Sequence, residues 1–221
     1  MLTAKNIRKS YGDLHVLKGI ELEIKQNEIV SIVGASGAGK STLLHILGTL
    51  DSPDTGSVHF DNEDILSFKS SNLAKFRNSN IGFIFQFHNL LPEFNALENV
   101  CIPGFIANKD KEEVLEEGRR LLSILGVKNR DLNKPSELSG GEQQRTAVAR
   151  ALINRPRIVF ADEPSGNLDS KNANELHDLF FKLRDELRQT FVIVTHNEQL
   201  AKMADRTLVM SDGMILENIS N

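Results

Sequence analysis

The chain has 221 residues, of which 40% are hydrophobic and 25% charged, and this composition excludes an intrinsically disordered protein. Its formal net charge of −4 argues against broad electrostatic binding to nucleic acid, and its single cysteine excludes an internal disulfide framework. No apolar stretch approaches the roughly 20 residues that a membrane-spanning helix needs, and the N-terminus has no signal-peptide pattern, so we expect a globular protein of a reducing compartment.

Two half-exposed strands are expected near the N-terminus, at Leu17–Ile24 and Ser57–Phe60, and they indicate a small antiparallel sheet. Further along the chain, short apolar runs rich in β-branched residues and phenylalanine have the length and composition of buried strands. These runs are Ile29–Val33, Ile81–Phe85, Ile158–Ala161, Phe191–Thr195 and Thr207–Met210.

Helical patterns lie between the buried strands. One apolar stripe joins residues 114 to 125, another joins residues 176 to 187, and the pattern between about 87 and 151 is mainly helical. Strands that alternate with helices predict an α/β fold with a mostly parallel core sheet. We therefore expect a single domain over residues 1–221, with an N-terminal antiparallel β-subdomain and a helical insertion that forms a subdomain at about 87–151.

The helical region also contains the densest charge of the chain, at Lys109–Glu117. Such a run is typical of a solvated helix face, and Glu116 and Arg120 have the i,i+4 spacing of a favourable ion pair. Cys101 has no catalytic partner in the sequence and is expected to be a small buried hydrophobic residue. We interpret these features as structural.

The segment that follows the strand 29–33 fits the phosphate-loop pattern G-x-x-x-x-G-K-[ST] in its strand-then-helix setting. Glycines let backbone amides surround an anion, and the helix N-terminus adds unpaired donors and a positive dipole end. Lys40 supplies a positive charge to the β- and γ-phosphates, and the Ser41 hydroxyl can ligate Mg²⁺. We expect the nucleotide to contact Gly34, Ala35, Ser36, Gly37, Ala38, Gly39, Lys40, Ser41 and Thr42.

Two adjacent carboxylates, Asp162 and Glu163, follow the buried strand 158–161. Ligands bind at such strand ends in open α/β sheets. Asp162 is placed to hold Mg²⁺ directly or through water, and Glu163 would leave the sheet and polarise the attacking water, an effect typically worth about 10²–10⁴ in rate. An ordinary exposed acidic pair is the alternative interpretation, and the preceding phosphate loop makes it the weaker one.

Between the phosphate loop and the Asp-Glu pair, residues Leu138–Gln143 spell Leu-Ser-Gly-Gly-Glu-Gln. This segment resembles the signature motif of the ABC-type ATPases, which are P-loop NTPases. Further motifs of that family occur in the family's order: Tyr11 near the N-terminus, Gln86 after a strand, the loop Ser165–Asp169, and His196 after another strand. The resemblance covers essentially the whole chain and implies ATP and Mg²⁺ as its cofactors.

The resemblance implies roles for several single residues. The adenine ring would stack on Tyr11. The alternative interpretation is that Tyr11 is only a surface residue of an early turn. His196 would hydrogen-bond the γ-phosphate and orient the water, while Gln86 would contact Mg²⁺ or water and couple the core to the helical insertion. Arg145 would support the phosphate or the Glu163 loop, or form a plain surface salt bridge, and the sequence favours neither. The other five histidines show no metal-ligand spacing.

Ser139 is expected to be the N-cap of a helix that runs to Ile153, with Gly140 and Gly141 allowing the close approach of an anion. In the family this helix points at the γ-phosphate held by the opposite protomer. The resemblance therefore implies a homodimer in which two chains enclose two ATP molecules, and it places Asp169 at the nucleotide as well.

ABC ATPases serve membrane transport or soluble roles in DNA repair, chromosome structure and translation. The stretch from Ser41 to Ser139 is only about 100 residues and is too short for a long coiled coil, and one cysteine cannot provide zinc clusters. Translation-factor types have two such domains in one chain. The soluble class, including DNA-associated ATPases, is therefore the less favoured alternative to an ATPase subunit that docks on a separate membrane protein.

Local strings resemble the bacterial lipoprotein-releasing and macrolide-exporter group, and the chain as a whole most resembles its lipoprotein-releasing (LolD-type) ATPases. These strings are Leu43–Gly48, Leu90–Pro92, Ala96–Val100 with Pro103, and Glu163–Asp169. One departure is Ser165, where relatives often have Thr. A macrolide-exporter-like or cell-division (FtsE-type) complex remains the alternative, because the ATP motifs do not separate these groups.

The resemblance also implies the location and partners of the chain: the cytoplasmic side of the bacterial inner membrane, bound peripherally to integral-membrane permease subunits, with no nucleic acid. The groove around Gln86–Pro103 would receive a short helix of the permease. Phe87, Leu90, Leu91 and Phe94 are candidates for that apolar contact, and core packing of the insertion is their alternative role.

Overall fold

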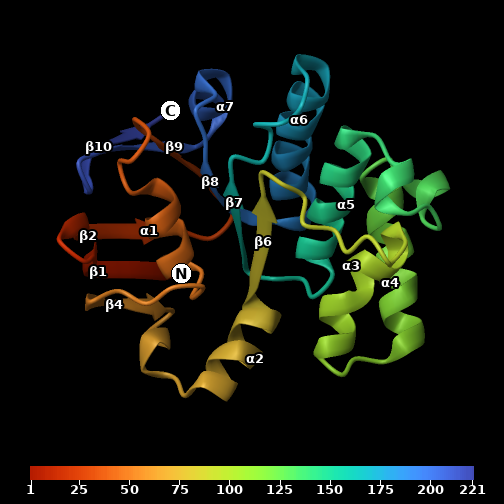
Figure 1. The fold of residues 1–221 in the computed structure, drawn as a ribbon, viewed down its shortest axis with the longest axis horizontal. Helices are drawn as coiled ribbons and strands as arrows, with labels where there is room; N and C mark the ends of the chain where they lie inside the picture. Colours follow the sequence, from red (N-terminus) through yellow and green to blue (C-terminus); the bar gives the residue numbers. More distant parts are fainter.

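The computed structural model describes residues 1–221 as two β-sheets with helices packed between and beside them (Figure 1). The strands are β1 (Leu2–Tyr11), β2 (Leu14–Ile24), β3 (Ile29–Val33), β4 (Thr55–Phe60), β5 (Glu63–Asp64), β6 (Ile81–Phe85), β7 (Ile158–Asp162), β8 (Thr190–Val194), β9 (Arg206–Ser211) and β10 (Met214–Ser220). The helices are α1 (Lys40–Leu47), α2 (Ser70–Asn80), α3 (Ala96–Ile106), α4 (Lys111–Ile124), α5 (Gly140–Leu152), α6 (Ser170–Leu187) and α7 (Glu198–Met203).

The larger sheet has the order β10-β9-β3-β8-β7-β6, and every pairing in it is parallel except that of β10 at the edge. The bounds of β3 and β6 are those that the sequence predicts. The strand β7 differs from the prediction by one residue at one end, and β8 and β9 differ by one residue at both ends. The mostly parallel core sheet is therefore confirmed.

Side chains of the larger sheet alternate between two hydrophobic cores. On β7, Ile158 and Phe160 pack into the core that α1 shares with the smaller sheet, whereas Val159 packs into the core under the helices α3 to α6. On β8, Val192 packs into the core next to α1, and Phe191 packs into the core under the helices α3 to α6. Because both faces of these strands are covered, their sequences are continuous apolar runs.

The smaller sheet is antiparallel with the order β2-β1-β4-β5, as the N-terminal pattern predicts. Several elements escape the sequence patterns, among them β1, β10 and α2. The strand β1 bulges near Asn6, whose φ is 48°, so its alternation is interrupted. The strand β10 is almost entirely exposed and the helix α2 has no buried residue, so neither has an apolar face to detect.

The helices α3, α4 and α5 pack together on one side of the larger sheet, away from the smaller sheet (Figure 1). Asn95 and Glu98 form a capping box at the start of α3. The buried Asn99 then donates from its amide to the backbone carbonyls of Leu91, Phe94 and Asn95 at 3.0–3.1 Å. These bonds fix the path of the chain into the helical region.

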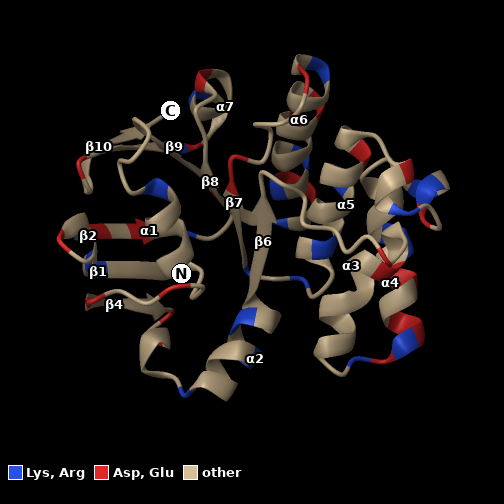
Figure 2. Ribbon diagram, in the orientation of Figure 1, with Lys and Arg blue, Asp and Glu red and all other residues tan.

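The charged run on α4 faces solvent, and acidic and basic positions are interspersed along this helix (Figure 2). The prediction of a Glu116–Arg120 pair is wrong, because Arg120 pairs with Glu117 at 2.7 Å instead. Glu117 also pairs with Arg155 at 3.3 Å, so the carboxylate faces the loop after α5. Cys101 is fully buried, as expected.

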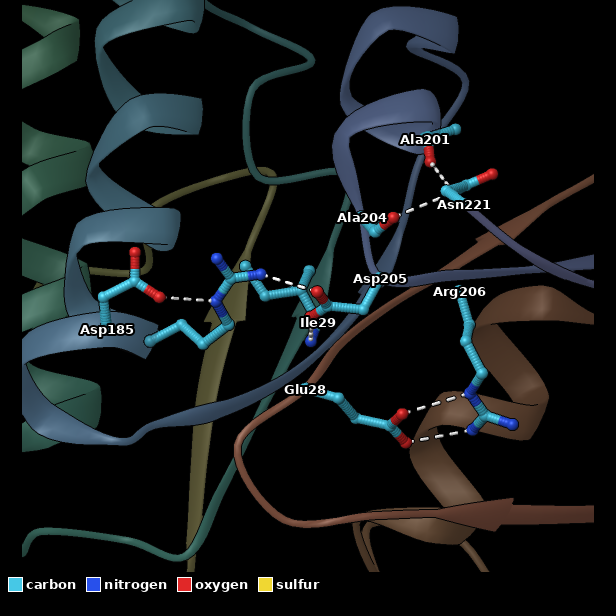
Figure 3. A network of polar contacts seen from close by, with 9 residues as sticks. Glu28, Ile29, Asp185, Ala201, Ala204, Asp205, Arg206 and Asn221 are labelled. Carbon is cyan, nitrogen blue, oxygen red and sulfur yellow. Dashed lines mark hydrogen bonds and ion pairs between the residues drawn. The ribbon is translucent and has the colours of Figure 1, made fainter.

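Polar contacts tie the entrance of β3 to β9 and α6 (Figure 3). Glu28 accepts two hydrogen bonds from the Arg206 guanidinium, at 3.1 and 2.9 Å. Asp205 accepts one from the Ile29 amide and one from Arg184 on α6, each at 2.7 Å. The edge of the sheet opposite the nucleotide loop is therefore fixed by charged groups.

None of the helices has the length and apolar character needed to cross a bilayer.

Candidate active site

The phosphate loop joins the end of β3 to the start of α1. Gly34 and Gly39 have φ values of 149° and 94°, in the left-handed region that favours glycine. A Cβ atom on Gly34 would collide with the Met210 carbonyl oxygen, and one on Gly39 would lie 2.9 Å from the Val16 carbonyl oxygen. The loop can therefore take this path only with glycine at both positions.

The loop lines a cavity of about 330 Å³. Its other walls come from β2, the end of β8 and the segments that follow β7 and β8. The lining residues are Leu14, Val16, Ser36, Gly37, Gly39, Lys40, Ser41, Thr42, Glu163, Val194 and His196. The cavity thus joins the sequence-predicted loop, Glu163 and His196.

Lys40 is 6% exposed, and its ammonium donates to the carbonyls of Gly34 and Ala35 at 2.9 Å each. No carboxylate pairs with it, so its charge faces the loop without an acidic partner. The Ser41 hydroxyl donates to Asp162 Oδ1 at 3.1 Å, while His45 Nε2 lies 4.0 Å from Asp162 Oδ2. Two oxygen groups of the kind that bind Mg²⁺ therefore lie side by side at the mouth of the loop.

Glu163 follows β7 with a φ of 47°, which is uncommon for a residue other than glycine. Its Oε2 accepts a hydrogen bond from the His196 amide at 3.2 Å. Its Oε1 lies 3.2 Å from the His196 ring nitrogen Nε2 but has no hydrogen bond. Burial raises the pKa of the Glu163 carboxyl above its ordinary value, and Asp162 adds to the rise, whereas His196 and Lys40 oppose it.

Gln86 contacts the loop after Glu163 and lies outside the cavity lining. Its side-chain amide donates to Asn167 Oδ1 at 3.1 Å, and the Asn167 amide donates back to the Gln86 carbonyl at 3.2 Å. Asn167 lies in the loop Ser165–Asp169 that the resemblance marks, although no role was expected of it alone. The pair joins Gln86 to this loop, and the expected coupling of the core to the helical insertion by Gln86 stays a prediction.

The signature segment forms a capped helix start, as predicted. Ser139 is the N-cap of α5 and exchanges capping-box bonds with Glu142, with α5 ending one residue before the expected Ile153. Asp169 caps α6 by accepting from the Asn172 amide at 2.9 Å. A Cβ on Gly140 would meet only Leu168, at 3.8 Å, so the space over this residue is open.

Ser139, Gly140, Gly141 and Asp169 do not line the cavity of the phosphate loop. The chain therefore holds two groups of site residues that it does not bring together. Arg145, for which the sequence left two roles open, lies 3.7 Å from Glu175 on α6, which is the salt-bridge alternative.

Tyr11 lies at the end of β1 and is 51% exposed, so its ring face is available for stacking. Its hydroxyl donates to Asp51 Oδ2 at 2.6 Å, and the Lys9 ammonium lies 5.1 Å from the ring centroid. This hydrogen bond raises the pKa of the Tyr11 phenol. Asp51 is a further residue that the sequence patterns missed, because nothing in its local context marks it as the partner of Tyr11.

A family profile described as "ABC transporter" matches residues 17–166, which is more than half of the chain. The chain belongs to the ABC transporter family. This ABC protein is 59% identical over 216 residues to the lipoprotein-releasing system ATP-binding protein LolD of Bacteroides fragilis, covering 98% of this chain and all of that protein. It is 60% identical over 216 residues to the LolD of Cytophaga hutchinsonii, and the match covers 98% of this chain and 99% of that protein.

Among solved structures, the ABC protein resembles a dimeric ATP-binding cassette in a post-hydrolysis state bound to ADP and Pi. The TM-score is 0.91 and the sequence identity 39%, covering 100% of this chain and 98% of that one. The P-loop NTPase fold expected from the sequence is thereby confirmed, and this ABC protein is an ATPase that converts ATP and water to ADP and phosphate.

One histidine of the ABC protein has a contact that its sequence context did not suggest. His177, one of the five histidines without metal-ligand spacing, is buried on α6, and its Nε2 lies 3.0 Å from the Ser165 hydroxyl in the loop after Glu163. Its position within the apolar stripe of residues 176–187 was the available signal.

Proposed function

We propose that the chain is the ATP-hydrolysing subunit of a bacterial ABC transporter that releases lipoproteins from the inner membrane through a separate permease. The observation that carries this proposal is the identity of 59–60% to LolD proteins over almost the full length of both partners. The ATPase part of that function is supplied by the phosphate loop, by the acidic pair Asp162 and Glu163, and by the capped helix of the signature segment.

We propose that Ser41 and Asp162 hold Mg²⁺ beside the nucleotide, because a Mg²⁺ ion on a nucleotide needs only one or two protein oxygens besides phosphate and water. When bound, Mg²⁺ neutralises charge on the phosphate oxygens. Residues 34–42 bind the phosphates and Tyr11 supports the adenine. Gln86 bonds to Asn167 outside the cavity lining, and its contact with Mg²⁺ or water would need a movement toward the nucleotide.

The proposed base is Glu163. Glu163 lines the cavity of the phosphate loop and its Oε1 has no hydrogen bond, so the carboxylate can accept a proton from an attacking water. His196 shares the cavity and holds Glu163 by its backbone amide, so its ring can orient the same water and contact the γ-phosphate. The neighbouring carboxylate, Asp162, accepts a hydrogen bond from Ser41, so Glu163 is the member of the acidic pair that remains for the role of base.

We propose that two copies complete each active site. Ser139, Gly140 and Gly141 stand at a helix N-terminus that is open over Gly140, and they do not line the chain's own cavity, so a second chain is needed to bring them to the γ-phosphate. Asp169 belongs to the same surface. The whole chain would then be one ATP-binding domain with a helical subdomain at about 87–151.

The permease would dock between the core sheet and the helical region. A groove of about 500 Å³ lies there, between α2, β6, α3 and α5, and includes Asn89 and Pro103 of the expected segment. Phe87, Leu91 and Phe94 on that segment are exposed, with 70% of Phe87 accessible, which favours the docking role over core packing. Such a subunit binds peripherally to the cytoplasmic side of the inner membrane.

The test is to recover the tagged chain from detergent-solubilised membranes of its own host and to identify what co-purifies. We expect integral-membrane permease subunits, and release of a lipid-anchored protein from proteoliposomes that contain the complex with ATP. The Lys40→Ala variant should retain the permease but lose release. Recovery on DNA without a membrane protein, or a complex that releases no lipoprotein, would contradict the proposal.

A further inference from the structure

A buried histidine lies beside the turn that follows Glu163. Only 1% of His177 is exposed, and its Nε2 lies 3.0 Å from the Ser165 hydroxyl. Its other ring nitrogen, Nδ1, is buried and has no hydrogen-bond partner. The residues that share this face of α6 are Ala173, Leu176, Phe180 and Leu183.

The ring is neutral in this setting. Burial lowers the pKa of the His177 imidazole, and the adjacent Asp178 opposes the shift only in part. A proton on Nδ1 would leave a buried N–H donor without an acceptor, whereas a proton on Nε2 leaves only a lone pair unpaired. The hydrogen-bond network therefore assigns the proton to Nε2, which donates to Ser165 Oγ.

The turn that Ser165 belongs to contains strained backbone. Glu163 has left-handed φ and immediately precedes Pro164, a position that restricts the backbone further. Backbone bonds within the turn join the Gly166 amide to the Glu163 carbonyl at 3.0 Å and the Leu168 amide to the Ser165 carbonyl at 3.1 Å. Strain of this kind persists only where surrounding contacts hold it.

Two side chains from outside the turn bind its central residues, Ser165 and Asn167. Gln86 pairs with Asn167 on the side of the helical region. His177 bonds Ser165 from α6, close to Glu163 in the chain. An apolar side chain at position 177 would fill the same space without the cost of burying an imidazole, so the bond to Ser165 is the feature that distinguishes histidine here.

We propose that His177 is a positioning residue for ATP hydrolysis: its hydrogen bond to Ser165 holds the turn 163–169 in the conformation that directs Glu163 into the nucleotide cavity. The proposal rests on the proposed role of Glu163 as the base. Nucleotide affinity is assigned to the phosphate loop and Tyr11, which the hydrogen bond of His177 does not touch. Loss of the bond should therefore lower kcat and leave KM for ATP unchanged.

The first test is steady-state ATP hydrolysis by the purified full chain with His177→Leu. We expect kcat to fall about fivefold, the size of effect that one neutral hydrogen bond gives, with an unchanged KM. His177→Gln, which can still donate to Ser165, should recover most of the loss. Phe180→Leu is the matched control, because it loosens the same buried face of α6 without touching the turn, and it should lower Tm but not kcat at 25 °C.

The second test is a double-mutant cycle. Ser165→Ala should cause the same fall in kcat as His177→Leu, the double variant should be no worse than either, and Ser165→Thr should stay close to wild type. Additive losses, a wild-type kcat in His177→Leu, or an equal fall in kcat in Phe180→Leu would overturn the proposal.

The variant Glu163→Gln distinguishes a failure of the proposed base from a failure of the positioning role of His177. If Glu163→Gln hydrolyses ATP at the wild-type rate, the assignment of the base is wrong, whatever His177 does. If Glu163→Gln is inactive and His177→Leu retains wild-type kcat, only the positioning role of His177 is wrong.

Discussion

Glu163 leaves β7 with left-handed backbone and places its carboxylate in the cavity that the phosphate loop lines. One carboxylate oxygen is held by the His196 amide, and the other lies 3.2 Å from the His196 ring nitrogen without a hydrogen bond. The carboxylate therefore stands between His196 and the nucleotide cavity, where a water of the reaction can bond to it.

Replacing Glu163 with Gln should lower kcat by about 10²–10⁴ and leave ATP binding intact, because the amide keeps the shape but cannot take a proton. Hydrolysis rates and calorimetric ATP titrations would measure the two effects. The matched variant is Lys40→Ala, which should lose nucleotide affinity instead. Wild-type turnover by Glu163→Gln would exclude Glu163 as the base.

The raised pKa of Glu163 gives a pH dependence. A base must be ionised, so kcat/KM should fall on the acid side with an apparent pKa above the ordinary glutamate value of about 4.3. Because the pKa of Glu163 is raised, the native state binds the proton of this carboxyl more tightly than the unfolded state does. The contribution of Glu163 to the free energy of unfolding is therefore full below the ordinary glutamate pKa and is lost as pH rises through the raised pKa. The residual rate of Glu163→Gln should lack the acid limb, and an unchanged limb would refute the assignment.

At the scale of elements, the entrance of β3 is held by the pair between Glu28 and Arg206, whose side chains are only 10% and 15% exposed. Figure 3 shows the two carboxylate oxygens of Glu28 facing the guanidinium. Removing one partner of such a pair leaves a poorly solvated charge. The register of β3 against β9 depends on this corner, and β3 leads into the phosphate loop.

Glu28→Ala should lower the free energy of unfolding by about 3 kcal/mol, measured by urea denaturation. Asp61→Ala is the control. Its pair with Arg157 is as short, 2.6 Å, but both side chains are over one-third exposed, so its loss should cost less than about 1 kcal/mol. Equal losses in the two variants would contradict the importance of burial at this corner.

The sequence predicts those elements whose side chains are buried, as continuous apolar runs in β3 and β6 and as a periodic apolar stripe in α6. It does not predict β10 or α2, because exposed elements have no periodic apolar face. The same limit applies in the site. The phosphate loop is a contiguous motif, whereas the contacts of His177 with Ser165 and of Tyr11 with Asp51 join segments that only the fold brings together.

At the scale of the whole molecule, the site residues form two groups on one chain. The cavity group contains the phosphate loop, Glu163 and His196, and the signature group contains Ser139, Gly140 and Gly141. The two groups meet only if a second copy supplies what the first lacks. A closed C2 dimer satisfies this requirement at both sites at once.

If one chain holds half of each active site, the mass of Glu163→Gln in sedimentation equilibrium with Mg²⁺ should depend on the nucleotide. We expect a dimer with ATP and a monomer with ADP. Adding Gly140→Asp should restore the monomer in ATP, because open space over Gly140 accommodates the side chain while its charge repels the triphosphate. A monomer of Glu163→Gln at saturating ATP, or a dimer that Gly140→Asp leaves intact, would contradict the claim.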